Sequence, residues 1–252
     1  MTKISAGLAV VWVVSALLGC ASPGASKLSA EQIGTLLSAP DRTEADRTND
    51  VRRKAPQLLA FIDPQPGMRV LDLGAGGGYT TELLARAVGA TGHVYAQNNA
   101  YFVKNLLKGR FDERLSSPSM RNVSHYMLEF ENPIPKDVRP ASLDLVTFMF
   151  TYHDLGWVGT DRAAMNRAVF AALKPGGHYV LADHSGRPGT GISESKSLHR
   201  IDEAFLRAEV EAAGFKFVEE GSFLRNPNDP RDKSVFKPAQ PNDEFVLKFV
   251  KP

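Results

Sequence analysis

A short apolar stretch that runs directly into a cluster of glycines is the feature that most constrains the fold of this chain. Residues 69–73, "RVLDL", have the length and aliphatic content of a buried strand. "GAGGG" follows at 74–78, and residues 79–88 then have the spacing of a helix. A strand that enters a helix through glycines brings backbone N–H groups and a helix N-terminus close to a ligand. The stretch therefore predicts a ligand at the carboxyl end of this strand.

The rest of the chain alternates between strand-like and helix-like segments, which is typical of a parallel sheet with helices on both faces. We expect further strands at 93–97, 123–128, 143–150 and 178–183, and helices at 46–61, 99–107, 161–173 and 202–213. Two more strands, at 215–223 and 244–249, would pair antiparallel across a polar loop. With 252 residues, 43% of them hydrophobic, the chain can bury one sizeable core.

Charge and histidine spacing exclude some classes of partner. The 30 basic and 28 acidic residues give a net charge of +2 and form no basic stripe, so we expect a small-molecule substrate and no nucleic acid. The six histidines show no short ligand spacing, so no metal site is predicted. The sequence does not indicate the oligomeric state.

The N-terminal 20 residues have the layout of a secretory signal. Lys3 precedes an apolar run, and small residues precede Cys20, the single cysteine. "ALLGC" resembles the bacterial lipoprotein box; a buried core helix is the alternative. The pattern predicts a signal peptide at 1–19, a lipid anchor at Cys20, a linker and lead-in at 20–40, and a domain at 41–252. The domain would then lie on the periplasmic side of the cell envelope, or in the cytoplasm if the signal is not used.

The glycine cluster differs from a dinucleotide-binding fingerprint. After Gly74 and Gly76, the sixth position holds Tyr79 where that fingerprint has glycine, which argues against NAD or FAD. The stretch instead resembles motif I of the class I S-adenosylmethionine-dependent methyltransferases, with an acid two residues before three spaced glycines, namely Asp72, Gly74, Gly76 and Gly78. The resemblance implies S-adenosylmethionine as cofactor. It also implies that the glycines approach the methionine half of the cofactor and that Asp72 contacts its polar groups.

Three later segments extend the resemblance over residues from about 50 onward. "ASLDLVTFMFTYHDL", at 141–155, resembles the fourth-strand motif, and "ALKPGGHYVLADH", at 172–184, resembles the turn into the fifth strand. The closing helix and two strands resemble the reversed hairpin of this family. The resemblance implies a Rossmann-like seven-stranded α/β sheet, mostly parallel with an antiparallel last strand. It further implies methyl transfer to a small-molecule acceptor that the sequence does not identify.

The second strand departs from the family pattern. The family has Asp or Glu there, which accepts both ribose hydroxyls, but this chain has Gln97. An amide offers one uncharged acceptor, so we expect Gln97 to make one ribose hydrogen bond, helped by Asn98 or Asn99, and the cofactor to bind more weakly; a plain surface loop is the alternative. After the third strand, Glu129 is the candidate for the adenine amino group; Glu131 competes with it, and a solvated loop is the alternative.

Methyl transfer to oxygen or nitrogen needs an aligned nucleophile and a proton acceptor. Tyr152, His153 and Asp154 follow the fourth strand, where this family places residues that face the substrate, and His153 is the candidate base. A structural role is the alternative for this cluster. Asp183 and His184 end the fifth strand, and His199 and Arg200 begin a helix that could cover the pocket; for these four a structural role is the stronger expectation.

Two other functions stay open from the sequence. A degenerate methyltransferase fold could serve as an envelope ligand-binding lipoprotein, which Gln97 and the signal would both favour. A nucleotide-dependent oxidoreductase is disfavoured by Tyr79. The charged lead-in helix, which includes Arg52, Arg53 and Lys54, is either a solvated face or a lid over the cofactor.

Overall fold

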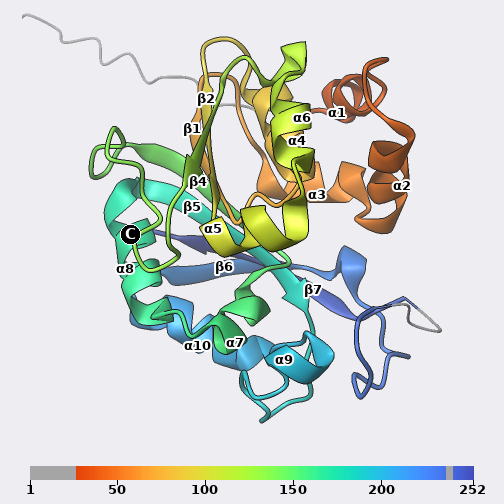
Figure 1. Ribbon diagram of the computed structural model, residues 1–252, viewed down its shortest axis with the longest axis vertical. Helices are drawn as coiled ribbons and strands as arrows, with labels where there is room; N and C mark the ends of the chain where they lie inside the picture. The colour runs from red at the N-terminus through yellow and green to blue at the C-terminus, as the bar shows by residue number, and fades with distance from the viewer. Residues whose placement is uncertain (1–26, 237–240) are drawn as a thin grey trace, which may run out of the picture.

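A seven-stranded sheet organises the protein, for which a computed structural model describes residues 27–236 and 241–252. The strand order is β3-β2-β1-β4-β5-β7-β6 (Figure 1). Strand β7 runs antiparallel to β5 and β6, and the other neighbouring strands are parallel. The predicted fold class is thereby confirmed. The strands are β1 Arg69–Leu73, β2 His93–Asn98, β3 Val123–Met127, β4 Leu143–Met149, β5 Leu173–His184, β6 Lys216–Gly221 and β7 Glu244–Val250.

Helices cover both faces of the sheet (Figure 1). The longer ones are α1 Ala30–Leu37, α2 Glu44–Arg52, α3 Ala55–Ile62, α4 Tyr79–Val88, α6 Arg110–Leu115, α8 Arg162–Ala172 and α10 Glu203–Ala212. Short helices and helical turns are α5 Ala100–Phe102, η1 Val103–Leu107, η2 Pro118–Met120, η3 Tyr152–Asp154, α7 Leu155–Val158, α9 Ser195–Leu198 and η4 Ser222–Leu224.

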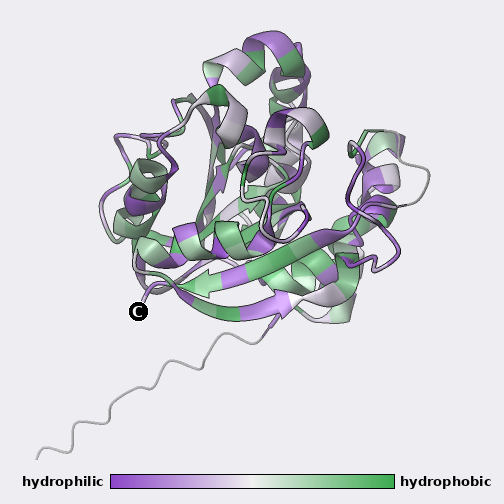
Figure 2. Cartoon of the chain, turned by 90° about the horizontal axis from the view of Figure 1, so that it is seen from below, coloured by the Kyte–Doolittle hydropathy of each residue, from purple (hydrophilic) through white to green (hydrophobic). Residues whose placement is uncertain are grey.

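The strands bury apolar side chains on both sides because successive residues point to opposite faces. In β1, Leu71 and Leu73 pack into the core that α8 and α10 cover, and Val70 packs into the core that α3, α4 and α6 cover. Figure 2 shows hydrophobic residues concentrated along the strands, while the helices carry hydrophilic residues beside hydrophobic ones. This arrangement is the reason that the strands read as nearly continuous apolar runs in the sequence.

The N-terminal part of the structure differs from the sequence prediction. The helix predicted at 46–61 is two helices, because Lys54 adopts a left-handed backbone (φ 46°) and Pro56 follows at the start of α3. Helix α1 lies inside the predicted linker 20–40 and buries Ile33 against the domain. The predicted signal peptide and the lipidation at Cys20 fall outside the described residues and stay predictions.

In the part of the chain that the structure describes, none of the helices combines the length and the hydrophobicity that crossing a membrane requires.

Candidate active site

The three motif glycines in the turn between β1 and α4 have two different roles, close packing and access for a ligand. A Cβ at Gly74 would lie 2.7 Å from the ring of Phe148, and one at Gly78 would lie 2.9 Å from Cδ of Arg114. These two glycines are therefore required by packing. A Cβ at Gly76 would meet only the Gly74 carbonyl oxygen, 4.0 Å away, so this glycine faces open space. Gly76 is the position at which a ligand can approach the backbone.

A hollow of about 140 Å³ lies over this turn. The residues Gly74–Gly77, the end of β4 at Met149–Thr151, and Arg53 contribute to its lining. The hollow thus opens where the carboxyl ends of β1 and β4 meet, the position at which open α/β sheets bind their ligands.

Asp72 lies at the base of this hollow and is 1% exposed. Its carboxylate accepts hydrogen bonds from the hydroxyls of Thr81, at 2.6 Å, and Thr147, at 2.7 Å. Burial raises the pKa of Asp72 to about 6, although both hydroxyls favour the charged form. The carboxylate is therefore held in one orientation, with a charge that a ligand cation would stabilise.

Arg53 is a residue that the sequence prediction left undecided between a solvated face and a lid. Its guanidinium carbon lies 5.1 Å from the ring centroid of Tyr79 and 4.7 Å from that of Phe150. Burial lowers the pKa of Arg53 to about 10, and among the described residues its Nε has no hydrogen-bond partner. A half-buried guanidinium at the wall of a hollow is suited to an anionic group. "RRK" in a polar segment gave no signal of this burial.

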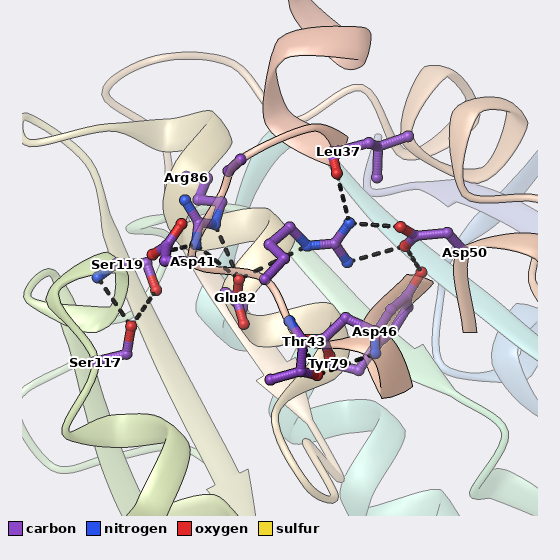
Figure 3. A network of polar contacts seen from close by, with 12 residues as sticks. Leu37, Asp41, Thr43, Asp46, Asp50, Tyr79, Glu82, Arg86, Ser117 and Ser119 are labelled. Atoms are coloured by element: carbon purple, nitrogen blue, oxygen red, sulfur yellow. Dashed lines mark hydrogen bonds and ion pairs between the residues drawn. The ribbon is translucent and has the colours of Figure 1, made fainter. Parts of the chain in front are cut away.

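Polar contacts fix helix α2 and the loop before it over the glycine turn (Figure 3). Asp50 of α2 pairs with Arg42 at 2.5 Å and accepts a hydrogen bond of 2.6 Å from the Tyr79 hydroxyl. Asp46 pairs with Arg114 at 2.6 Å, and Arg114 also pairs with Glu82 of α4. The segment that carries Arg53 is therefore attached to α4 and α6 at several points, as a cover over the cofactor region requires.

Gln97 and Asn98 do not reach toward a ligand. Both are fully buried. The amide oxygen of Gln97 accepts the N–H of Gly74 at 3.0 Å, and its amide nitrogen donates to the carbonyl of Leu128 at 2.5 Å. The amide oxygen of Asn98 accepts the N–H of Gly76 at 2.8 Å. The expected ribose contact of Gln97 is thus not supported by this geometry, in which both amides hold the glycine turn in shape.

Replacing Gln97 by Asp is therefore expected to destabilise the protein. Aspartate is one methylene shorter than glutamine, so its carboxylate does not reach the Gly74 N–H from the same position, loses the donor to Leu128, and buries a charge beside a carbonyl oxygen. We expect a loss of about 2–4 kcal/mol in the free energy of unfolding, measured by urea denaturation. Arg47→Met on the exposed side of α2 is the control. A variant with unchanged stability and tighter cofactor binding would restore the ribose contact predicted from the sequence.

A second hollow, of about 360 Å³, lies at the ends of β2 and β3. Asn99, Tyr101, Glu129, Glu131 and Trp157 are among its lining residues. The Asn99 amide donates to Glu129, so this carboxylate is held at the rim. The structure brings both acidic candidates, Glu129 and Glu131, to one site, together with two aromatic rings.

Tyr152 faces the core and not the hollows. Its side chain is fully buried, and its hydroxyl donates to Glu209 and accepts from Asn166, at 2.9 Å each. Burial and the charge of Glu209 raise the pKa of this phenol. The substrate-facing role expected for Tyr152 is therefore not supported, and a structural role fits its contacts.

His153 lies between two carboxylates. Its Nδ1 is 2.6 Å from Asp183, and its Nε2 is 3.2 Å from Asp154. Burial opposes the charged ring, but the carboxylates of Asp183 and Asp154 outweigh it and raise the pKa of His153 to about 10. A ring with that pKa holds its proton at neutral pH, so this arrangement does not favour the expected role as a base. Asp154 is 17% exposed at its side chain and lies closer to solvent.

A third hollow, of about 740 Å³, borders the first. His184 and Arg52 line it, and both contact Phe150, which lines the first hollow. The rings of His184 and Phe150 are 5.3 Å apart, and the guanidinium carbon of Arg52 lies 5.3 Å from the Phe150 centroid. Phe150 therefore separates a small glycine-lined hollow from a larger one.

Comparisons with known proteins agree with this arrangement. Residues 64–214, more than half of the chain, match the family described as methyltransferase domain. The ubiquinone/menaquinone biosynthesis C-methyltransferase UbiE of Vibrio vulnificus is 28% identical over 179 residues, which cover 69% of this chain and 64% of that protein. The match thus spans less than two thirds of that relative's length.

Solved structures share the fold at low sequence identity. A methyltransferase from Aquifex aeolicus, described as S-adenosylmethionine-dependent, has a TM-score of 0.59 at 19% identity, and 90% of this chain and all of that chain are covered. The [4+2]-cyclase SpnF has a TM-score of 0.58 at 15% identity, with 82% of each chain covered. At such identities the likeness concerns the fold alone.

The cofactor region fits the group that this family uses. Gly76 leaves the space in which a ligand can contact the backbone, Asp72 supplies a buried carboxylate, and Arg53 supplies a cationic guanidinium. An amino acid moiety, with one ammonium and one carboxylate, matches this pair of charges. The chain belongs to the methyltransferase-domain family, the class I S-adenosylmethionine-dependent methyltransferases, and its cofactor is S-adenosylmethionine.

Proposed function

We propose that this protein transfers a methyl group from S-adenosylmethionine to a small organic acid bound in the 740 Å³ hollow. The observation that carries the proposal is Phe150, whose ring contacts residues of both the glycine-lined hollow and the large hollow. A donor in the first hollow and an acceptor in the second would be adjacent. Adjacent, aligned reactants are the main requirement for transfer of an activated methyl group.

The cofactor would extend over two of the hollows. Arg53 would bind the carboxylate of its methionine part and Asp72 would favour its ammonium group, because these charged groups line the 140 Å³ hollow. The adenosine part would reach the 360 Å³ hollow, where Tyr101 and Trp157 offer flat apolar surfaces and Glu129 offers an acceptor. When bound, the cofactor supplies a methyl group that is already activated for transfer.

The lining of the large hollow supports the acidic character of the acceptor. Three cationic residues, Arg52, Lys54 and Arg225, line it together with one acid, Glu244. Arg52 pairs with Glu244, and Arg225 pairs with acidic residues outside the lining, so the support for an anion comes mainly from Lys54. Phe236 and two aliphatic residues supply apolar surface. A molecule with an acidic group and an apolar body fits this mixture. The UbiE relatives are named for ubiquinone and menaquinone biosynthesis, which supports a ring-shaped body related to quinones.

The ligand-binding alternative has no support from the relatives, which are named as enzymes. Titration calorimetry of the full chain separates the two functions. We expect S-adenosylmethionine and S-adenosylhomocysteine each to bind with a stoichiometry of one per chain, and NAD not to bind. When an acceptor is added, S-adenosylhomocysteine should form. Binding without turnover for every acceptor in a broad panel would favour the alternative.

The acceptor pocket is tested with hydroxybenzoates and their uncharged amides. We expect the acids to be turned over and the amides not, and Phe236→Ala to raise the KM for the acid about tenfold, which corresponds to 1.4 kcal/mol. Val218→Ala, an exposed apolar residue on β6, is the matched control. The affinity for S-adenosylmethionine should be the same in all three proteins. Equal turnover of acids and amides would place the acceptor elsewhere.

A further inference from the structure

His153, Asp154 and His199 bring three potential metal ligands together after the carboxyl end of β4. Oδ1 of Asp154 lies 3.2 Å from Nε2 of His153 and 3.1 Å from Nδ1 of His199. One ligand atom from each residue lies within 4.8 Å of the other two. Two atoms that bind one ion at about 2.1 Å in a tetrahedral arrangement are about 3.4 Å apart. The cluster therefore has the spacing of a metal site.

Asp183 holds His153 in the orientation that a metal ligand requires. Oδ1 of Asp183 is 2.6 Å from Nδ1 of His153, and Oδ2 accepts the backbone N–H of His153 at 2.8 Å. Asp183 is fully buried, so the contact is fixed. A metal-binding histidine commonly donates its other ring N–H to a carboxylate, which sets the tautomer. Here that contact leaves Nε2 of His153 directed at Asp154.

The other two ligands are also fixed, and they are open on one side. The indole N–H of Trp157 donates to Oδ1 of Asp154 at 2.8 Å, and the ring of Phe236 lies 4.7 Å from that of His199. The side chains of Asp154 and His199 are 17% and 24% exposed, so an ion can reach them from solvent. Phe236 also lines the large hollow, which places the cluster beside it.

We propose that His153, Asp154 and His199 bind one divalent transition-metal ion next to the acceptor hollow, and that the ion takes the place of the proton on Nε2 of His153, which is released to solvent. Two imidazoles and one carboxylate favour ions such as Zn²⁺ or Co²⁺ over Mg²⁺ and Ca²⁺, which prefer oxygen ligands. Three protein ligands leave at least one coordination position of the ion free. Catalytic metal sites have such a free position, whereas structural sites are closed by four protein ligands. We expect an oxygen atom of a small molecule bound in the large hollow to occupy the free coordination position. Histidine spacing does not indicate this metal site, because His153 and His199 lie far apart in the chain and meet only through the fold.

Metal binding is measured on the full chain, purified without a histidine tag, treated with a chelator and dialysed. Every sample carries Cys20→Ser, so that no thiolate contributes. Zn²⁺ binding is followed by calorimetry, and Co²⁺ binding by visible absorption, whose intensity reports the coordination number. We expect one ion per chain and, for His199→Asn, an affinity reduced about 100-fold or more. Asn suits this position because His199 has a left-handed backbone (φ 54°), which Asn tolerates well.

Three further variants separate a metal site from a structural cluster. Asp154→Asn should lose binding as His199→Asn does, and Asp183→Asn should weaken it about 10–100-fold and alter the cobalt spectrum. His178→Asn, on β5 beside the amino end of β4, should bind as the wild type does. Circular dichroism confirms the fold of each variant. No binding by the wild type, or wild-type affinity in both His199→Asn and Asp154→Asn, would overturn the proposal. If the wild-type protein bound the metal but methylated none of the acceptors, the proposed function would be wrong and the metal site would stand.

Discussion

Replacing Gly76 by valine is expected to lower the affinity for S-adenosylmethionine by about 100-fold or more, or about 2.7 kcal/mol, while the protein remains folded. A Cβ at this position meets nothing closer than 4.0 Å, so the side chain is accommodated by the protein itself. The same side chain would fill the space in which the methionine part of the cofactor approaches the turn. Calorimetry with S-adenosylmethionine measures the effect.

Backbone strain is the competing explanation for such a loss, and Gly109→Val controls for it. Gly76 and Gly109 both have positive φ angles, 59° and 80°, and neither Cβ would meet a close neighbour. Each valine should therefore cost a similar 1–2 kcal/mol, roughly, in the free energy of unfolding. Only the variant at Gly76, beside the hollow, should lose cofactor affinity. Equal affinities in the two variants would move the cofactor away from this turn.

Replacing Arg53 by methionine is expected to weaken S-adenosylmethionine binding by about 30- to 150-fold, or about 2–3 kcal/mol, the range for a lost hydrogen bond to a charged group. Methionine preserves contact with Tyr79 and Phe150 but removes the charge and the N–H donors. Arg47→Met is the matched control, because Arg47 belongs to the same helix and is exposed. It should bind the cofactor as the wild type does.

A cofactor analogue makes the assignment of Arg53 specific. Decarboxylated S-adenosylmethionine lacks the group that Arg53 is proposed to bind. Arg53→Met and the wild-type protein should therefore bind this analogue with similar affinity, measured by calorimetry. If the variant lost affinity for both compounds to the same extent, Arg53 would act by shaping the cover over the hollow and not by binding the carboxylate.

The elements of the sheet could be predicted from the sequence because each has a strong local signal. Strand β1 and helix α4 begin and end where the apolar run, the glycines and the helical spacing place them. The break in the lead-in helix was missed, although Pro56 marks it, because the polar segment was interpreted as one continuous helix. Helix α1 has helical spacing in Ile33, Leu36 and Leu37, but the prediction of a linker at 20–40 hides it.

The positions of site residues can be predicted from the sequence only where the local backbone determines them. The glycine turn and Asp72 belong to one strand and its turn, so their positions follow from the motif. Gln97 was expected at the ribose because its place in the strand suggested so, but the choice between facing a ligand and bonding Leu128 depends on the neighbouring strand. The approach of His199 to His153 depends on tertiary packing of distant segments, which no spacing in the sequence indicates.

The position of β7 bears on how the protein is made. Because β7 lies between β5 and β6, the ribosome must release residues up to 250 before either neighbour has a partner on that side. Until then the long, apolar edge of β5 is exposed, and exposed edges of that kind can pair with other chains. His184 also pairs in register with Glu244, so one wall of the large hollow is absent from the nascent protein. A chaperone that shields β5 during synthesis would therefore have more effect on the yield of this protein than on that of a sheet completed in sequence order.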